Sequence, residues 1–280
     1  MRQKRKIESN IKGFKAWLSK QGLAESTINL YATYIKLMPY VTGASVNKAL
    51  NKGLTAYYAL KWYARFDKRV LKYLPSKPPR QPKPALRYPL TESEAYKILE
   101  YCKTAKYELY VFLLLLFHTG CRGGTIINLR LIDFEARGAE LAPGEDYTTF
   151  SIKTKGGERI VKPISKEVYD EVRHYARSKN IKDKIFNRPC QRTYGRWLHK
   201  ICKGLLFERY QGYPVQKVTL HHFRHLFCLR VYEETHDPLL CKLALNHKSF
   251  NSTERYLIGK ADRSGEVSLK LMRKSFPGHK

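Results

Sequence analysis

Acidic side chains are scarce in this 280-residue sequence, which contains 24 Asp and Glu residues against 53 Lys and Arg residues. The formal net charge at pH 7 is +29, whereas a net charge of about 2–8 is enough to keep a small domain soluble. The excess points to a polyanionic partner. Nucleic acid is the first candidate, because neutralised phosphates release their counterions, and an anionic membrane surface is the second.

Motifs that bind metals or nucleotides are missing. The sequence contains no HExxH, no DxD-type pair and no GxxxxGK[ST] loop, which argues against metal-dependent catalysis and against ATP use. The six cysteines form no CxxC or zinc-finger spacing. They are expected to be reduced, mostly buried thiols of a cytoplasmic protein. The sequence therefore predicts no metal and no cofactor.

Long apolar runs are also absent. The longest run, residues 110–117, is too short to span a bilayer and is expected to form a buried helix. The basic start of the chain lacks the apolar region of a signal peptide. No membrane-spanning segment is therefore expected, and nucleic acid rather than a membrane remains the expected partner.

A proline-rich segment at 76–89 divides the chain, because its prolines cannot continue a helix or a central strand. We expect a helical domain at 1–75, a linker at 76–89 and a second domain at 90–280. The linker is cationic, and it is either a positive strap that contacts a polyanion or a plain spacer. Its cations are Lys77, Arg80, Lys83 and Arg87.

Helical periodicity dominates both parts. Apolar residues recur at helical spacing from 11 to 18 and from 28 to 38, with Ser26 or Thr27 as a plausible N-cap. Four or five short helices would form a basic N-terminal bundle whose aromatic residues belong to its core. The fold class is therefore expected to be mainly α.

In the second part, Thr91 and Glu94 form a capping box, and Gly120 ends the helix that holds the long apolar run. A helix is expected to resume near Arg122. Two β-branched segments around 147–165 predict one antiparallel hairpin. The remaining helices are expected at 166–179, 191–204, 219–235, 237–246 and 264–275.

The residues that remain for catalysis are Arg, Lys, His and Tyr. His221 and Arg224 are three residues apart and share a helix face, where a guanidinium can hold two phosphate oxygens and an imidazole can transfer a proton. His222 and His225 are interpreted as packing residues. Arg122 stands next to glycines that let the backbone approach a ligand. Lys155 lies at the predicted hairpin tip, where charged residues are common in any protein.

Together, these motifs resemble the tyrosine recombinase, or phage integrase, family. The resemblance rests on TGxR, a lysine at a β-turn, HxxRH, and a histidine nine residues before a tyrosine. It implies a catalytic set of Arg122, Lys155, His221, Arg224, His247 and Tyr256. The sequence departs from the family at Thr125, where the family usually has Glu, and at Asn246, where Gly is usual. Lys153 is an alternative to Lys155.

The resemblance also implies a mechanism and an architecture. Tyr256 would attack a DNA phosphorus, leaving a 3′-phosphotyrosine and a free 5′-hydroxyl, with His221 as the base and Lys155 as the acid. The N-terminal bundle would be a core-DNA-binding domain that forms a C-shaped clamp with the catalytic domain. The partners would be double-stranded DNA with an inverted-repeat core site and further copies of the chain, as dimer or tetramer. A recombinase of this kind would be expected to belong to a mobile genetic element.

Two alternatives remain open from the sequence. A type IB topoisomerase uses the same chemistry on a single duplex. A regulator with a degenerate site would bind DNA without cutting it.

Overall fold

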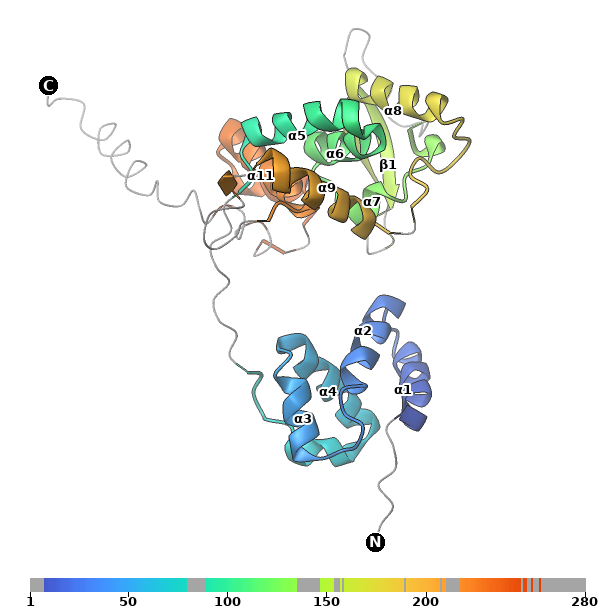
Figure 1. The fold of residues 1–280 in the computed structure, drawn as a ribbon, viewed down its shortest axis with the longest axis vertical. Coiled ribbons are helices and arrows are strands. Elements are labelled where there is room, and N and C mark those ends of the chain that lie inside the picture. Colours follow the sequence, from blue (N-terminus) through green and yellow to red (C-terminus); the bar gives the residue numbers. More distant parts are fainter. Residues whose placement is uncertain are drawn as a thin grey trace, which may run out of the picture. The chain divides into compact units, whose positions relative to one another are not determined.

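A computed structural model of the chain describes residues 8–79, 89–134, 147–153, 157, 159–188, 190–206, 208–209, 217–247, 249–250, 253 and 257. The chain divides into two compact units, residues 1–86 and 87–280 (Figure 1). No helix among the described residues has both the length and the apolarity needed to cross a membrane.

The first unit is a bundle of short helices. Its elements are α1 (Glu8–Lys20), α2 (Glu25–Ile35), α3 (Gly43–Leu50), α4 (Leu54–Phe66) and the 3-10 helix η1 (Lys68–Tyr73). The predicted helical stripes form its core, since Phe14, Leu18, Ile35 and Met38 are all fully buried. Phe14 packs edge-on against the buried ring of Tyr63, so these aromatics are core residues, as predicted.

One predicted helix start in this unit is wrong. α2 begins at Glu25, and its N-cap is Ala24, which makes no side-chain cap hydrogen bond. Leu23 packs against the core of the bundle. We attribute the earlier start to this packing, which fixes how the chain enters the helix and overrides the preference for a hydroxyl cap at Ser26 or Thr27.

The second unit is also mainly helical. Its elements are α5 (Glu92–Ala105), α6 (Tyr107–Thr119), α7 (Gly123–Ile126), the 3-10 helix η2 (Leu131–Phe134), β1 (Tyr147–Lys153), β2 (Arg159–Ser165), α8 (Lys166–Ser178), α9 (Arg192–Leu205), α11 (Leu220–Thr235) and α12 (Pro238–Ala244). The described part of the chain is thus mainly α with one two-stranded antiparallel sheet, as predicted. The predicted helix at 264–275 lies outside the described residues.

Helix α6 is the centre of this unit. It is apolar around its circumference, and it packs against α5, α8, α9 and α11 (Figure 1). A helix that is apolar on every side must be buried on every side. The predicted capping box starts its neighbour α5, where Thr91 and Glu94 exchange hydrogen bonds.

Two local features determine the path of the chain between α6 and η2. Gly120 ends α6 in the left-handed conformation, with φ of 60°. The helix predicted to resume near Arg122 is short, because α7 spans only Gly123–Ile126 before the chain pairs with residues 183–185. Since that pairing is long-range, local sequence gave no signal for it.

Gly120→Ala should destabilise the protein by about 2–4 kcal/mol, because it adds left-handed strain and steric overlap. A Cβ at Gly120 would lie 2.3 Å from Cδ1 of Phe227. The matched control is Gly204→Ala in α9, where a Cβ meets nothing within 4 Å and should stabilise the helix by about 0.5–1 kcal/mol. Urea unfolding measures both, and equal stabilities for the two variants would contradict this account.

Candidate active site

A cavity of about 590 Å³ opens where the starts of α7, α9 and α11 meet. None of the described residues that line it is acidic, and several are cations or histidines. The lining residues with ionisable basic groups are Arg122, Arg192, Arg196, His199, Lys217, His221 and Arg224. A concave surface of this charge suits a phosphate group.

Arg122 reaches this cavity from an exposed position at the N-cap of α7. The buried Cys121 immediately precedes Arg122 and anchors the backbone from which the arginine side chain extends. Gly123, which follows, also lines the cavity, and a Cβ there would lie 2.5 Å from Oε1 of Gln191. The glycine therefore leaves room for the Gln191 side chain beside the turn that carries Arg122.

Arg224 lines the same cavity although its residue is only 3% exposed. Its guanidinium donates hydrogen bonds to the main-chain oxygen of Gly120 and, at 2.7 Å, to that of Leu245. These bonds compensate for the loss of water around a buried cation. They also fix the orientation of the guanidinium before any ligand arrives.

His221 lies one turn before Arg224 on α11 and is exposed in the cavity. The two residues thus share a helix face, as their spacing predicts. His222 has a structural role: its Nδ1 accepts a hydrogen bond of 2.9 Å from the backbone N–H of Thr219, the N-cap residue. His225 is half-buried.

His247 follows Asn246, whose φ of 49° confirms that asparagine supplies a left-handed backbone here. The residue is 6% exposed, and its Nδ1 lies 2.9 Å from Oγ1 of the buried Thr253. Burial, together with the nearby charges of Arg224, Arg122 and His221, lowers the pKa of His247 to about 4. Four of the six predicted side chains therefore form one cluster.

The other two predicted residues, Lys155 and Tyr256, lie outside the described residues. Lys153, the alternative lysine, is exposed at the end of β1. On either side of Tyr256, Thr253 contacts His247 and Leu257 packs against the apolar cluster of Cys228, Cys241 and Leu245. Of the linker cations, Lys77 is exposed, whereas Arg80, Lys83 and Arg87 lie outside the described residues.

Sequence reasoning missed the wall that α9 adds to the cavity. Arg192, Arg196 and His199 lie at intervals of four and three residues, so they share one helix face. The opposite face carries the buried Tyr194, Leu198 and Cys202. That amphipathic pattern was a readable signal for a cationic surface.

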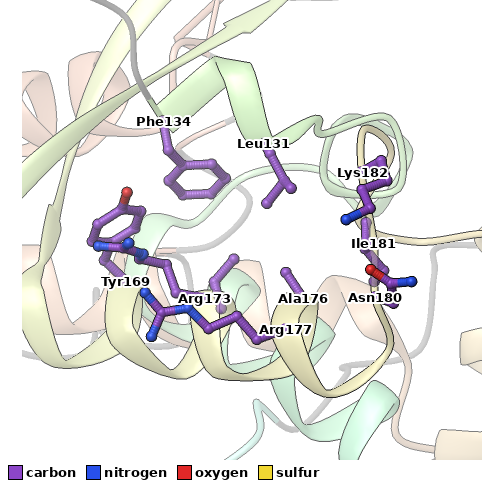
Figure 2. A pocket seen from close by; sticks show the side chains of 10 residues that line it. Leu131, Phe134, Tyr169, Arg173, Ala176, Arg177, Asn180, Ile181 and Lys182 are labelled. Carbon is purple, nitrogen blue, oxygen red and sulfur yellow. The ribbon is translucent and has the colours of Figure 1, made fainter.

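A second cavity, of about 450 Å³, contains none of the six predicted residues. Figure 2 shows Leu131 and Phe134 of η2 facing Arg173 and Ala176 of α8 across it. Its described lining combines apolar residues with basic ones and includes Tyr169, but it contains no histidine that could act as a base beside that phenol. Within the part of the chain that the structure describes, no group of three or more His, Cys, Asp or Glu residues could hold a metal ion.

Comparison with known proteins places this site in context. Residues 89–262 match the sequence model of the phage integrase family. The chain is 25% identical to the tyrosine recombinase XerA of Thermococcus kodakarensis over 283 residues, covering 94% of this chain and 97% of that protein. It is also 25% identical to XerA of Pyrococcus furiosus over 272 residues, or 91% of each chain.

Two solved structures share the fold. A lambda integrase dimer bound to a COC′ core site matches with a TM-score of 0.64 at 18% identity, over 90% of this chain and 77% of that one. The XerH recombinase bound to a palindromic difH substrate, in a post-cleavage complex, matches with a TM-score of 0.56 at 13% identity, over 96% and 97% of the two chains.

The low pKa of His247 predicts a pH-dependent stability. Above about pH 6.5 the imidazole is neutral in both the folded and the unfolded chain. Between about pH 6.5 and 4 only the unfolded chain binds the proton, so stability should fall by about 1.4 kcal/mol per pH unit. His118, whose pKa burial and Arg230 lower to about 4, should contribute in the same way.

Urea unfolding at pH 8 and at pH 5 tests this prediction. The stability lost between the two pH values should be smaller in His247→Gln than in the wild type, and His118→Gln should show a similar reduction. An unchanged loss in His247→Gln would mean that the folded protein protonates this imidazole normally.

Proposed function

Because this chain belongs to the phage integrase family, we propose that it is a site-specific DNA recombinase that cuts and rejoins strands through a 3′-phosphotyrosine link. The observation that carries this proposal is the cavity that Arg122, His221 and Arg224 line together, with His247 beside them. The relatives named above are recombinases, which favours recombination over the other uses of this chemistry.

The arginines would bind the scissile phosphate. Arg122 is exposed and can approach the non-bridging oxygens, while Arg224 is held by two main-chain carbonyls. Donors fixed in advance stabilise the charge that grows on the phosphoryl oxygens in the transition state, because little reorganisation is needed. The other basic residues of the cavity would hold neighbouring phosphates.

His221 and His247 would have different roles. His221 is exposed to the cavity and would accept the proton of the Tyr256 phenol, whose ordinary pKa of about 10 requires such a base. His247 is neutral near pH 7, because burial lowers its pKa to about 4. The hydroxyl of Thr253, 2.9 Å from Nδ1, would donate to that nitrogen, and the Nε2–H of His247 would donate to a phosphate oxygen.

Cleavage and rejoining would then need no external energy source. The phenolic oxygen of Tyr256 forms a bond to phosphorus, and the bond from phosphorus to the 5′-oxygen breaks. Lys155 would protonate the departing 5′-oxygen. Attack by another 5′-hydroxyl reverses these changes and releases Tyr256, so resealing consumes no ATP.

The proposed partner is duplex DNA bound by several copies of the chain. The matched lambda integrase and XerH structures contain DNA, and the first is a dimer. By analogy, we propose a core site with inverted repeats, with one protomer on each repeat and four protomers around two duplexes. The formal charge of +29 supports such a polyanionic assembly.

Tyr256→Phe should bind the core site with unchanged affinity but form no covalent adduct, because it lacks the phenolic oxygen. The measurement uses a nicked suicide substrate and denaturing gel electrophoresis. Tyr101→Phe, at an exposed position on α5, is the matched control and should form the adduct like the wild type. An adduct in Tyr256→Phe would assign the nucleophile to another residue.

Arg122→Ala should slow cleavage by about 10²–10³-fold, which is the usual effect of removing one oxyanion donor. Since the side chain is exposed, the thermal unfolding temperature should barely change. Arg130→Ala removes the same charge from an exposed residue outside the cavity lining and is the control. Equal cleavage rates in the two variants would remove Arg122 from the site.

A further inference from the structure

Lys162 occupies a position where the strand pattern calls for an apolar side chain. On β2, exposed residues alternate with less exposed ones, so Ile160, Lys162 and Ile164 point to the same, inner face. The cross-strand partner of Lys162 is Phe150, which is fully buried. Directly opposed residues share a sheet face, and the lysine therefore points into the protein.

The ammonium group of Lys162 joins two distant parts of the chain. Its Nζ donates a hydrogen bond of 2.9 Å to the main-chain oxygen of Thr119, the last residue of α6. It also donates to the main-chain oxygen of Ala244, the last residue of α12. Carbonyls at helix C-termini have no partner within the helix and attract cations, so both acceptors suit an ammonium.

Arg224 makes the same connection one residue further along each segment. Its guanidinium donates to the oxygens of Gly120 and Leu245. Two successive main-chain oxygens in each segment, four in all, are thus held by two cations. Arg122 lies two residues after Gly120, and His247 lies two residues after Leu245. The bonds that Lys162 and Arg224 make to both segments therefore set the distance between Arg122 and His247.

Burial of the lysine has a cost that apolar packing would avoid. Burial lowers the pKa of Lys162, and the positive charge of Arg224 lowers it further. A methionine of similar length would remove this cost. Lys162 is nevertheless a charged residue, and it bonds to the segments that carry Arg122 and His247. A role in holding these two segments explains its presence.

We propose that Lys162 is a positioning residue of the recombinase site, which with Arg224 holds the Arg122 and His247 segments in register for attack on the phosphate. This inference rests on the proposed function. Lys162 also lies in the middle of β2, opposite Phe150, so it ties the hairpin of β1 and β2 to the same two segments. It does not need to contact the DNA.

The first test is Lys162→Met, which keeps the length of the side chain and removes its charge and donors. Single-turnover cleavage, measured with all DNA bound, should slow by about 100-fold, as expected for a site displaced by about 1 Å. Affinity for the core site should change less than threefold. Lys162→Arg keeps a cation with several donors and should recover most of the rate.

The second test separates positioning from proton donation. A substrate with sulfur in place of the bridging 5′-oxygen releases a thiolate, which needs no acid because thiols have a pKa of about 8.5. This substrate should restore cleavage by Lys155→Met, the proposed acid variant, but should not restore Lys162→Met. Restoration of Lys162→Met would make Lys162 the acid and overturn the proposal.

Four further outcomes are decisive. An unchanged cleavage rate in Lys162→Met would overturn the proposal, and so would a parallel loss of binding and cleavage, which indicates a purely structural role. If Lys162→Met does not fold, Lys162→Gln takes its place, and a full rate in that variant would count against positioning. Absence of any adduct in the wild type would instead reject the proposed function.

Discussion

The burial of the Arg224 guanidinium is the constraint on which the site depends. A cation that is removed from water is tolerated only where its donors meet acceptors, and two of the acceptors here are the oxygens of Gly120 and Leu245. Those oxygens belong to the ends of two segments that lead to Arg122 and His247. The bonds that make the burial tolerable therefore also fix the geometry of the cluster, so the fold and the site have a common origin.

Local chemistry in the sequence predicted the elements whose stability is local. The capping box of Thr91 and Glu94, the helix end at Gly120 and the hairpin were all confirmed. The predicted N-cap of α2 and the predicted length of the helix after Arg122 were wrong. Packing of Leu23 decides the first, and pairing with residues 183–185 decides the second. Contacts between residues far apart in sequence leave no periodic signal, and a motif search over one segment cannot detect them.

The cluster of Arg122, His221, Arg224 and His247 could be predicted because each residue stands in a short motif, and the motifs occur in a fixed order. Lys162 could not be found in this way, since it belongs to no motif. Its signal was a cation on the inward face of an alternating strand, which acquires meaning only when the carbonyls of Thr119 and Ala244 are known to lie beside it. The motifs thus indicate the groups that are proposed to meet a ligand, whereas the groups that support them follow from the tertiary structure.

The electrostatics of the cavity explain why the charge of its lining is so one-sided. Arg122, Arg224 and His221 all lower the pKa of His247, which means that these groups repel an added positive charge. No acidic residue among the described lining relieves this repulsion. A phosphate would relieve it, since an anion placed between the arginines attracts each of them. A carboxylate in the cavity would stabilise the free protein but compete with the ligand, so a site without acids holds its cations available for the DNA backbone.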